Sequence, residues 1–275
     1  MKSFCIKTNN AEIIRYLIEE FSKYKKNDFI VKFKSFKLYD NIILHFLSSN
    51  IDVFYSIISN VLSDTILKFY EPVELKRELK RNFFYFTEYE KERIVELCLA
   101  ENTSNSTLYL DKFNYLFISF YNYISNHHSI VLTGFYNFRL GKYHNILNEI
   151  LDISVGDYLI EREYLEFINL LKLYINSNPF KSNLIHLIYS NQEFIVLDEN
   201  KNIINPENKN ILNAKFLSDI SFSGNDYVLN YLLNELPRKI IIHVPPTFSF
   251  KDDFYNTLKL IFDDRIIISS KRPQI

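Results

Sequence analysis

Histidine is the residue type in this chain best suited to metal or acid–base chemistry, and three histidines lie fairly close together in the sequence. His127, His128 and His144 could offer imidazole nitrogens to zinc or nickel. Adjacent histidines point in different directions, however, and no cysteine or acidic residue lies at ligand spacing from them. We therefore interpret them as polar residues of an interhelical loop, and we expect neither a metal site nor any other cofactor.

A fourth histidine, His243, lies near the end of the apolar run Ile240 to Val244, which is typical of a buried strand. Ligands of open α/β sheets bind at the carboxyl ends of parallel strands, so His243 could contact a ligand or act as an acid or base. The competing interpretation, which we favour, is a strand-end residue that hydrogen-bonds a backbone carbonyl. His243 is kept as a candidate ligand-proximal residue.

Two acidic pairs, Asp252-Asp253 and Asp263-Asp264, lie at opposite ends of one predicted helix. The first pair suits the positive end of the helix dipole, and the second is typical of a solvated turn. A magnesium site would need a phosphate-binding partner that the sequence does not offer.

The common catalytic and nucleotide-binding motifs are absent. The four glycines form neither GxGxxG nor GxxxxGKS/T, and no GxSxG, HExxH or CxxC occurs. Catalytic groups can converge from distant positions, so an enzyme is not excluded, but the sequence singles out no catalytic residue.

Basic residues are concentrated near the start of the chain, where residues 1–40 hold nine Lys and Arg against five Asp and Glu. With Phe33 and Phe36 available for stacking, this region could bind nucleic acid. A further basic stretch, residues 76–81, is interrupted by Glu78, and alternating signs are typical of a solvated helix face. The net charge of −1 also gives no overall attraction to nucleic acid.

The elements that position these residues belong to a chain long enough for two domains, with 47% hydrophobic residues. Cys5 and Cys98 cannot build a disulfide framework, which fits a reducing compartment. The N-terminus is interrupted too soon by polar residues to be a signal peptide. The most apolar stretch, Tyr115 to Ile124, is shorter than the about 20 residues that a spanning helix needs. We expect a soluble, cytoplasmic protein that does not contact a membrane.

Periodicity divides the chain into three predicted regions. Residues 1–72 have a βαββα pattern: a strand at Phe4–Lys7, a helix at Ala11–Tyr24, a hairpin of Phe29–Lys34 and Ile42–Phe46, and a helix at Asp52–Phe69. Pro72 marks a break. Residues 73–180 have helical patterning, and their last two helices are predicted at Gly134–Leu151 and Tyr158–Ile175.

Residues 181–275 change to an α/β pattern. A hairpin is predicted at Leu184–Tyr189 and Phe194–Leu197, and strands at 239–244 and 265–269 flank a helix that a capping box, Ser249 to Asp252, opens and Phe262 ends. Strand, helix, strand at this spacing predicts a parallel βαβ unit. The predicted fold class is α+β (mixed α/β), with a small N-terminal βαββα unit, a helical middle region and a C-terminal α/β unit.

The run Gly134-Phe-Tyr-Asn-Phe-Arg-Leu-Gly-Lys-Tyr143 resembles the GF-x-x-FRL-x-x-Y stretch of the YtxC-like sporulation proteins of endospore-forming Firmicutes. Further matches follow in the same order, at residues 157–171, 237–243 and 261–266. The resemblance covers residues 134–269, with a weaker extension towards the N-terminus. It implies a cytoplasmic protein that is linked to sporulation and has no assigned activity, so it transfers no catalytic residue.

Arg139 and Glu163 are charges at the margins of two apolar helix faces. Arg139 neighbours the stripe that contains Tyr136 and Tyr143, and Glu163 flanks Tyr164 of the next predicted helix. A charge at such a margin usually has a partner, because burying it alone is costly. The favoured interpretation is that Arg139 and Glu163 tie the two helices together. The alternative is that Arg139 binds a ligand, with Tyr143 as a candidate ligand-proximal residue.

We therefore expect a non-enzymatic protein that takes part in sporulation by binding a partner, which we expect to be another protein. The first alternative is an enzyme of unknown chemistry, which would show a deep pocket with convergent polar groups near Arg139 or His243. The second is a nucleic-acid-binding factor that uses the basic N-terminal region. A binding module would show an exposed apolar patch, whereas a nucleic-acid-binding factor would show a continuous basic groove.

Overall fold

The computed structural model describes residues 2–24, 29–100, 107–190, 193–205, 223–245, 248 and 252–270. The chain divides into two compact units, Met1–Ile160 and Glu161–Ile275, and each has its own sheet and core. Both units mix helices with strands, and each sheet contains parallel and antiparallel pairs, which confirms the predicted α+β class. Residues 1–72 and most of the predicted helical region share the first unit. The division into three regions stays a prediction.

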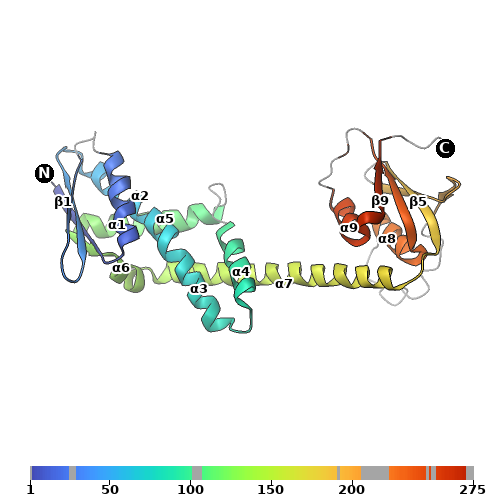
Figure 1. The fold of residues 1–275 in the computed structure, drawn as a ribbon. Coiled ribbons are helices and arrows are strands. Elements are labelled where there is room, and N and C mark those ends of the chain that lie inside the picture. Colours follow the sequence, from blue (N-terminus) through green and yellow to red (C-terminus); the bar gives the residue numbers. More distant parts are fainter. Residues whose placement is uncertain are drawn as a thin grey trace. The chain divides into compact units, whose positions relative to one another are not determined.

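Unit 1 is built on a four-stranded sheet in the order β2-β3-β1-β4. The strands are β1 (Lys2–Thr8), β2 (Phe29–Lys34), β3 (Asp40–Phe46) and β4 (Ser129–Val131). Alternate side chains of β1 and β3 are buried, so one face of the sheet enters the core. α1 (Ala11–Lys23) begins after Asn10 and packs against β2 and β3 (Figure 1). The predicted hairpin is confirmed by the antiparallel pairing of β2 with β3.

Sequence patterning did not predict β4, because three residues are too few for an alternation to show. The strand buries Ile130 and pairs in parallel with β1. His127 precedes it, and its ring stacks on Tyr123 with 4.0 Å between the ring centroids. Within the described ranges, no three His, Cys, Asp or Glu side chains lie together as metal ligands would.

The predicted break at Pro72 is wrong. α2 (Ile51–Thr65) passes into a π-helical turn, η1 (Ile66–Tyr70), which continues directly into α3 (Glu71–Asn82). Pro72 lies in the first turn of α3, where proline is tolerated because its fixed backbone angle already suits a helix. α4 (Glu88–Ala100) and α5 (Thr107–Asn126) follow.

The two helices predicted at Gly134–Leu151 and Tyr158–Ile175 have other boundaries. α6 (Leu132–Arg139) is short, and α7 (Gly141–Ser177) is one helix of 37 residues. It continues through Gly156 because Leu151, Val155 and Tyr158 keep helical spacing across that position and are all buried. The first part of α7 belongs to unit 1, and the part from Glu161 belongs to unit 2.

Unit 2 contains a five-stranded sheet in the order β7-β6-β5-β8-β9. Its elements are β5 (Ser182–Ser190), β6 (Glu193–Leu197), β7 (Ile203–Ile204), α8 (Gly224–Glu235), β8 (Pro237–His243), α9 (Asp253–Phe262), a 3₁₀ turn η4 (Asp263–Arg265) and β9 (Ile266–Ser269). β8 and β9 are adjacent and parallel, with Ile240 opposite Ile266, as predicted. The capping prediction for α9 needs correction, because Asp252 caps the helix and accepts from the Tyr255 N–H. Ser249 lies outside the described residues.

In the part of the chain that the structure describes, no helix combines the length and apolar character needed to cross a bilayer.

Candidate ligand-binding site

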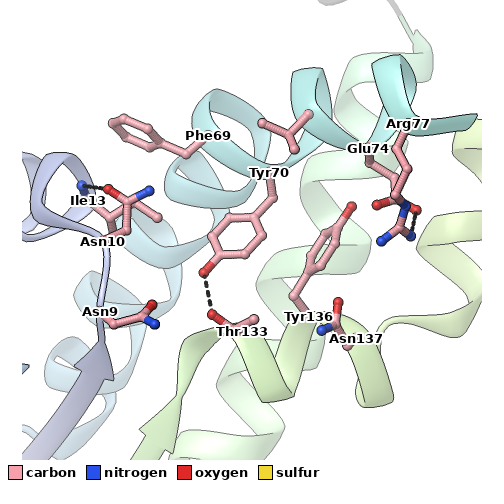
Figure 2. Close-up of a pocket in the computed structure, with 11 residues that line it drawn as sticks. Asn9, Asn10, Ile13, Phe69, Tyr70, Glu74, Arg77, Thr133, Tyr136 and Asn137 are labelled. Carbon is pink, nitrogen blue, oxygen red and sulfur yellow. Dashed lines mark hydrogen bonds and ion pairs between the residues drawn. The ribbon is translucent and has the colours of Figure 1, made fainter. Parts of the chain in front are cut away.

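A pocket of about 300 Å³ opens in unit 1 where three segments meet (Figure 2). Its lining comes from the β1–α1 connection and α1, from η1 and α3, and from α6. The lining residues are Asn9, Asn10, Ile13, Phe69, Tyr70, Val73, Glu74, Arg77, Thr133, Tyr136 and Asn137. The volume is that of a small-molecule site at the lower end of the usual range.

Local structure fixes several of these side chains. Asn10 caps α1, because its side-chain oxygen accepts from the N–H groups of Glu12 at 2.9 Å and Ile13 at 3.2 Å. The Tyr70 hydroxyl lies 3.3 Å from the Thr133 hydroxyl, and its ring packs on that of Tyr136 with 4.7 Å between centroids. The π-helical turn that precedes α3 carries Tyr70, and π-helical turns often occur at functional sites.

The Tyr136 hydroxyl is the least satisfied polar group of the pocket. The residue is only 3% exposed, and its hydroxyl has no hydrogen-bond partner among the described residues. Burial, and then the Glu74 and Glu71 carboxylates, raise the pKa of Tyr136 well above its ordinary value. The hydroxyl therefore keeps its proton at neutral pH and is available as a donor. In Figure 2, the hydroxyl end of the Tyr136 ring points towards Glu74 and Arg77.

Glu74 and Arg77 supply the charges of the pocket. Arg77 Nη2 lies 2.5 Å from Glu74 Oε1, and the Glu74 side chain is 10% exposed whereas that of Arg77 is 62% exposed. His144 lies near the same carboxylate oxygen, with Nδ1 3.8 Å from Glu74 Oε1 and Nε2 3.0 Å from the Tyr136 carbonyl oxygen. The carboxylate is held in place, while the guanidinium lies at the mouth of the pocket.

A second acidic residue of α3 lies deeper in the core. Lys112 Nζ is 2.7 Å from Glu71 Oε1, and both side chains are almost fully buried. Tyr143 donates a hydrogen bond from its hydroxyl to the other carboxylate oxygen of Glu71. Burial, and then Glu71, raise the pKa of Tyr143 well above its ordinary value, so the hydroxyl stays a donor.

The interpretation of α3 as a solvated face of alternating charge is wrong for its acids. Glu71, Glu74 and Glu78 are all buried, and they are spaced three and four residues apart on the face that also carries Leu75 and Leu79. The sequence spacing could have indicated that these acids are buried, because residues three or four positions from Leu75 and Leu79 lie on the same face of the helix. Neither Glu74 nor Tyr136 was predicted as a site residue.

Of the predicted residues, Tyr143 does not line the pocket, but its ring centroid lies 6.5 Å from that of the lining residue Tyr136, and its hydroxyl donates to Glu71. Arg139 lines another hollow, of about 290 Å³, where its guanidinium carbon is 5.8 Å from the centroid of the Tyr123 ring. Glu163 lies on α7 in unit 2. The predicted second helix is a continuation of α7, and Arg139 and Glu163 belong to different units, so their pairing stays a prediction.

His243 is buried at the end of β8, and its Nε2 lies 3.0 Å from Nδ1 of His186 on the neighbouring strand β5. The expected contact was with a backbone carbonyl, whereas this contact is with a side chain of a parallel strand. Burial, and then the His243 ring, lower the pKa of His186. The pair is neutral in at least one of its rings, because a hydrogen bond between two imidazoles needs one unprotonated nitrogen.

Comparison with known proteins gives the chain a family. The model of the YtxC-like family matches residues 56–267, which extends further towards the N-terminus than the stretch that resembled this family in the sequence alone. An uncharacterised protein YtxC of Bacillus subtilis (strain 168) is 22% identical over 135 residues, which are 49% of this chain and 46% of that protein. The chain thus spans about half the length of this curated relative. No solved structure matches the chain.

The matched residues include α3, α6 and all of α7, and with them most of the pocket. They also include β5, β8 and α9 of unit 2. Because the family model matches well over half of the sequence, the chain belongs to the YtxC-like family.

Proposed function

We propose that this protein takes part in sporulation as a non-enzymatic, cytoplasmic binding protein, and that it binds another protein through an apolar face of α7 in unit 2. The supporting observation is an exposed stripe, in which Phe167, Leu170 and Leu173 are 53%, 63% and 64% exposed. The same part of α7 buries Ile168 and Ile175 in the core of unit 2. This helix therefore has two apolar faces, and exposed apolar patches mark interaction sites.

The spacing of the exposed residues indicates the kind of partner. Tyr174 is 44% exposed and also belongs to the stripe. Phe167, Leu170 and Tyr174 are three and four residues apart, which is the spacing along which one α-helix packs on another. Glu163 and Glu166 are exposed beside the start of this stripe, and Arg162 Nε lies 3.5 Å from Glu166 Oε1, so these three residues give the stripe an edge with one net negative charge. The complementary partner is an amphipathic helix with apolar residues along one face and basic residues beside them.

The test is capture of the partner from sporulating cells by the tagged full chain. Phe167→Glu combined with Leu170→Glu places two charges in the stripe, so we expect loss of the partner and fewer spores, with an unchanged circular dichroism spectrum. Leu165→Glu is the matched control, because Leu165 is exposed on the opposite side of the same helix.

A photoreactive residue at position 170 identifies what covers the stripe. We expect a crosslink to a helix of another protein that carries basic residues. A crosslink to a second copy of this chain alone would replace the proposal with self-association. Normal spore numbers and unchanged partner capture in the double variant would overturn it.

A further inference from the structure

The pocket of unit 1 has a lining residue, Tyr136, whose hydroxyl could donate a hydrogen bond to a ligand. Tyr136 lines the pocket and is more than nine-tenths buried, and no described residue accepts a hydrogen bond from its hydroxyl. A buried hydroxyl without a partner is unfavourable, and native proteins rarely leave one unsatisfied. The pocket therefore suits a molecule that offers an acceptor at this point.

The charges beside Tyr136 restrict the chemistry of that molecule. A simple anion would lie against the buried Glu74 carboxylate, and a simple cation would lie against the Arg77 guanidinium. A molecule with one ammonium and one carboxylate meets both. Its ammonium can bind Glu74 and its carboxylate can bind Arg77, so that no charge is left buried without a partner.

The exposure of the two charged residues allows a ligand to replace the ion pair between Glu74 and Arg77. Glu74 is fixed in the wall, whereas Arg77 is mostly exposed and can turn towards a ligand without leaving its own helix. The rest of the wall contains the apolar side chains of Ile13, Phe69 and Val73 and the ring of Tyr70. Such a wall suits an apolar or aromatic group.

We propose that this pocket binds a free α-amino acid with an apolar or aromatic side chain. Glu74 accepts hydrogen bonds from the α-ammonium group. Arg77 and the Tyr136 hydroxyl donate to the α-carboxylate, and the side chain lies against Phe69, Tyr70 and Val73. A pocket of about 300 Å³ holds one such molecule, and it is small for a nucleotide or a folded peptide. This binding is independent of the apolar face of α7.

Calorimetry and thermal shift with the full chain test the proposal, with the twenty common amino acids as probes. We expect an apolar or aromatic amino acid to bind and to raise the melting temperature. Its N-acetyl derivative lacks the ammonium charge and its methyl ester lacks the carboxylate charge, so both should bind at least about tenfold more weakly.

Substitutions locate the site. Glu74→Gln, Arg77→Met and Tyr136→Phe should each weaken binding by roughly tenfold or more, because each removes a hydrogen bond to a charged ligand group. Arg81→Met is the matched control. Arg81 forms the equivalent ion pair with Glu78 one turn further along α3, at 2.7 Å, and Arg81 does not line the pocket. This control variant should bind normally.

Three results would overturn the proposal. One is the absence of any heat or thermal shift with millimolar amino acids. Another is equal binding of the acetylated or esterified derivatives, which would show that the ammonium and carboxylate charges do not contribute to binding. The third is binding that survives Glu74→Gln, Arg77→Met and Tyr136→Phe, which would place the amino acid elsewhere.

Discussion

Lys112 and Glu71 form an ion pair inside unit 1, with 2.7 Å between Nζ and Oε1 and with 0% and 1% of their side chains exposed. The two residues come from α5 and α3, so the pair joins two helices across the core. Tyr143 of α7 binds the same carboxylate. Both charges have lost their hydration, so the arrangement is stable only while every member is present.

Lys112→Met should therefore lower the free energy of unfolding by about 3–5 kcal/mol, because it leaves the Glu71 carboxylate buried without its cation. Combining it with Glu71→Leu should recover part of this loss, since an apolar pair replaces the ion pair, although the Tyr143 hydroxyl loses the Glu71 acceptor. Urea denaturation of the two single variants and the double variant measures the coupling. Lys76→Met, at an exposed position of α3, should change stability by less than about 0.5 kcal/mol. Additive losses in the double variant would contradict this account.

Sequence patterning predicted most strands and helices of both units because their apolar spacing is regular. The alternation in β1 to β3 and the β-branched run of β8 are local signals that tertiary structure did not override. The prediction missed β4 because this strand forms by pairing with β1, and a window of three residues contains no signal of that pairing. The prediction divided α7 into two helices for a different reason. Gly156 lies between the two predicted helices, but the burial of Val155 and Tyr158 keeps this position in one continuous helix.

The pocket was less predictable than the fold. Tyr136 was recognised within the motif, but as part of an apolar stripe, because a tyrosine at helical spacing is usually core. Glu74 lies just before the basic stretch 76–81, whose alternating charges were interpreted as a solvated helix face. What makes these residues a site is the meeting of α3 with α6 and with the Asn9–Asn10 connection, and the sequence separation of these segments hides that meeting.

The raised pKa values of Tyr136 and Tyr143 predict a loss of stability in alkali. In the unfolded chain a tyrosine loses its proton near pH 10, whereas in the folded chain these two keep theirs to higher pH. Their contribution is therefore complete below about pH 10 and is lost as the pH rises above it. Melting temperatures between pH 8 and pH 12 should fall less steeply in Tyr136→Phe and Tyr143→Phe than in the wild type. The exposed Tyr89→Phe is the control and should follow the wild type.

The His186–His243 pair predicts a loss of stability in acid. Burial and His243 lower the pKa of His186, so the unfolded chain takes up a proton at a pH where the folded chain does not. The contribution of His186 is present above its unfolded pKa of about 6.5 and is lost as the pH falls through its lowered folded value. His186→Gln should reduce this acid dependence in melts between pH 7 and pH 5. An identical pH profile in the variant would show that the pair does not control it.

The basic N-terminal region should not bind nucleic acid with sequence specificity at physiological ionic strength. Phe33 and Phe36 are about half exposed, but Lys34 Nζ lies over the Phe36 ring, 5.1 Å from its centroid, and so occupies a face on which a base would stack. The net charge of −1 gives no overall attraction to phosphates. Titration of single-stranded DNA at increasing salt measures the effect, because phosphate contacts release counterions. A tight complex that Lys34→Glu abolishes, and that weakens steeply with salt, would establish the nucleic-acid alternative.

Substitution of Arg139 tests whether this residue contributes through its contact with Tyr123 or through the predicted pair with Glu163. Its side chain is exposed and lies over the Tyr123 ring, and an exposed cation–π contact contributes about 0.5–1 kcal/mol. Arg139→Ala should therefore lower the free energy of unfolding by about that amount, far below the 3–5 kcal/mol expected if it left a buried acid unpaired. Arg139→Lys should retain part of the contact, and Tyr123→Leu should remove the effect of the Arg139 substitution. Glu163→Ala, alone and combined with Arg139→Ala, completes the cycle in urea denaturation. Additivity with Glu163 places the contribution of Arg139 at Tyr123, whereas a coupling above about 1 kcal/mol with Glu163 would restore the predicted pair.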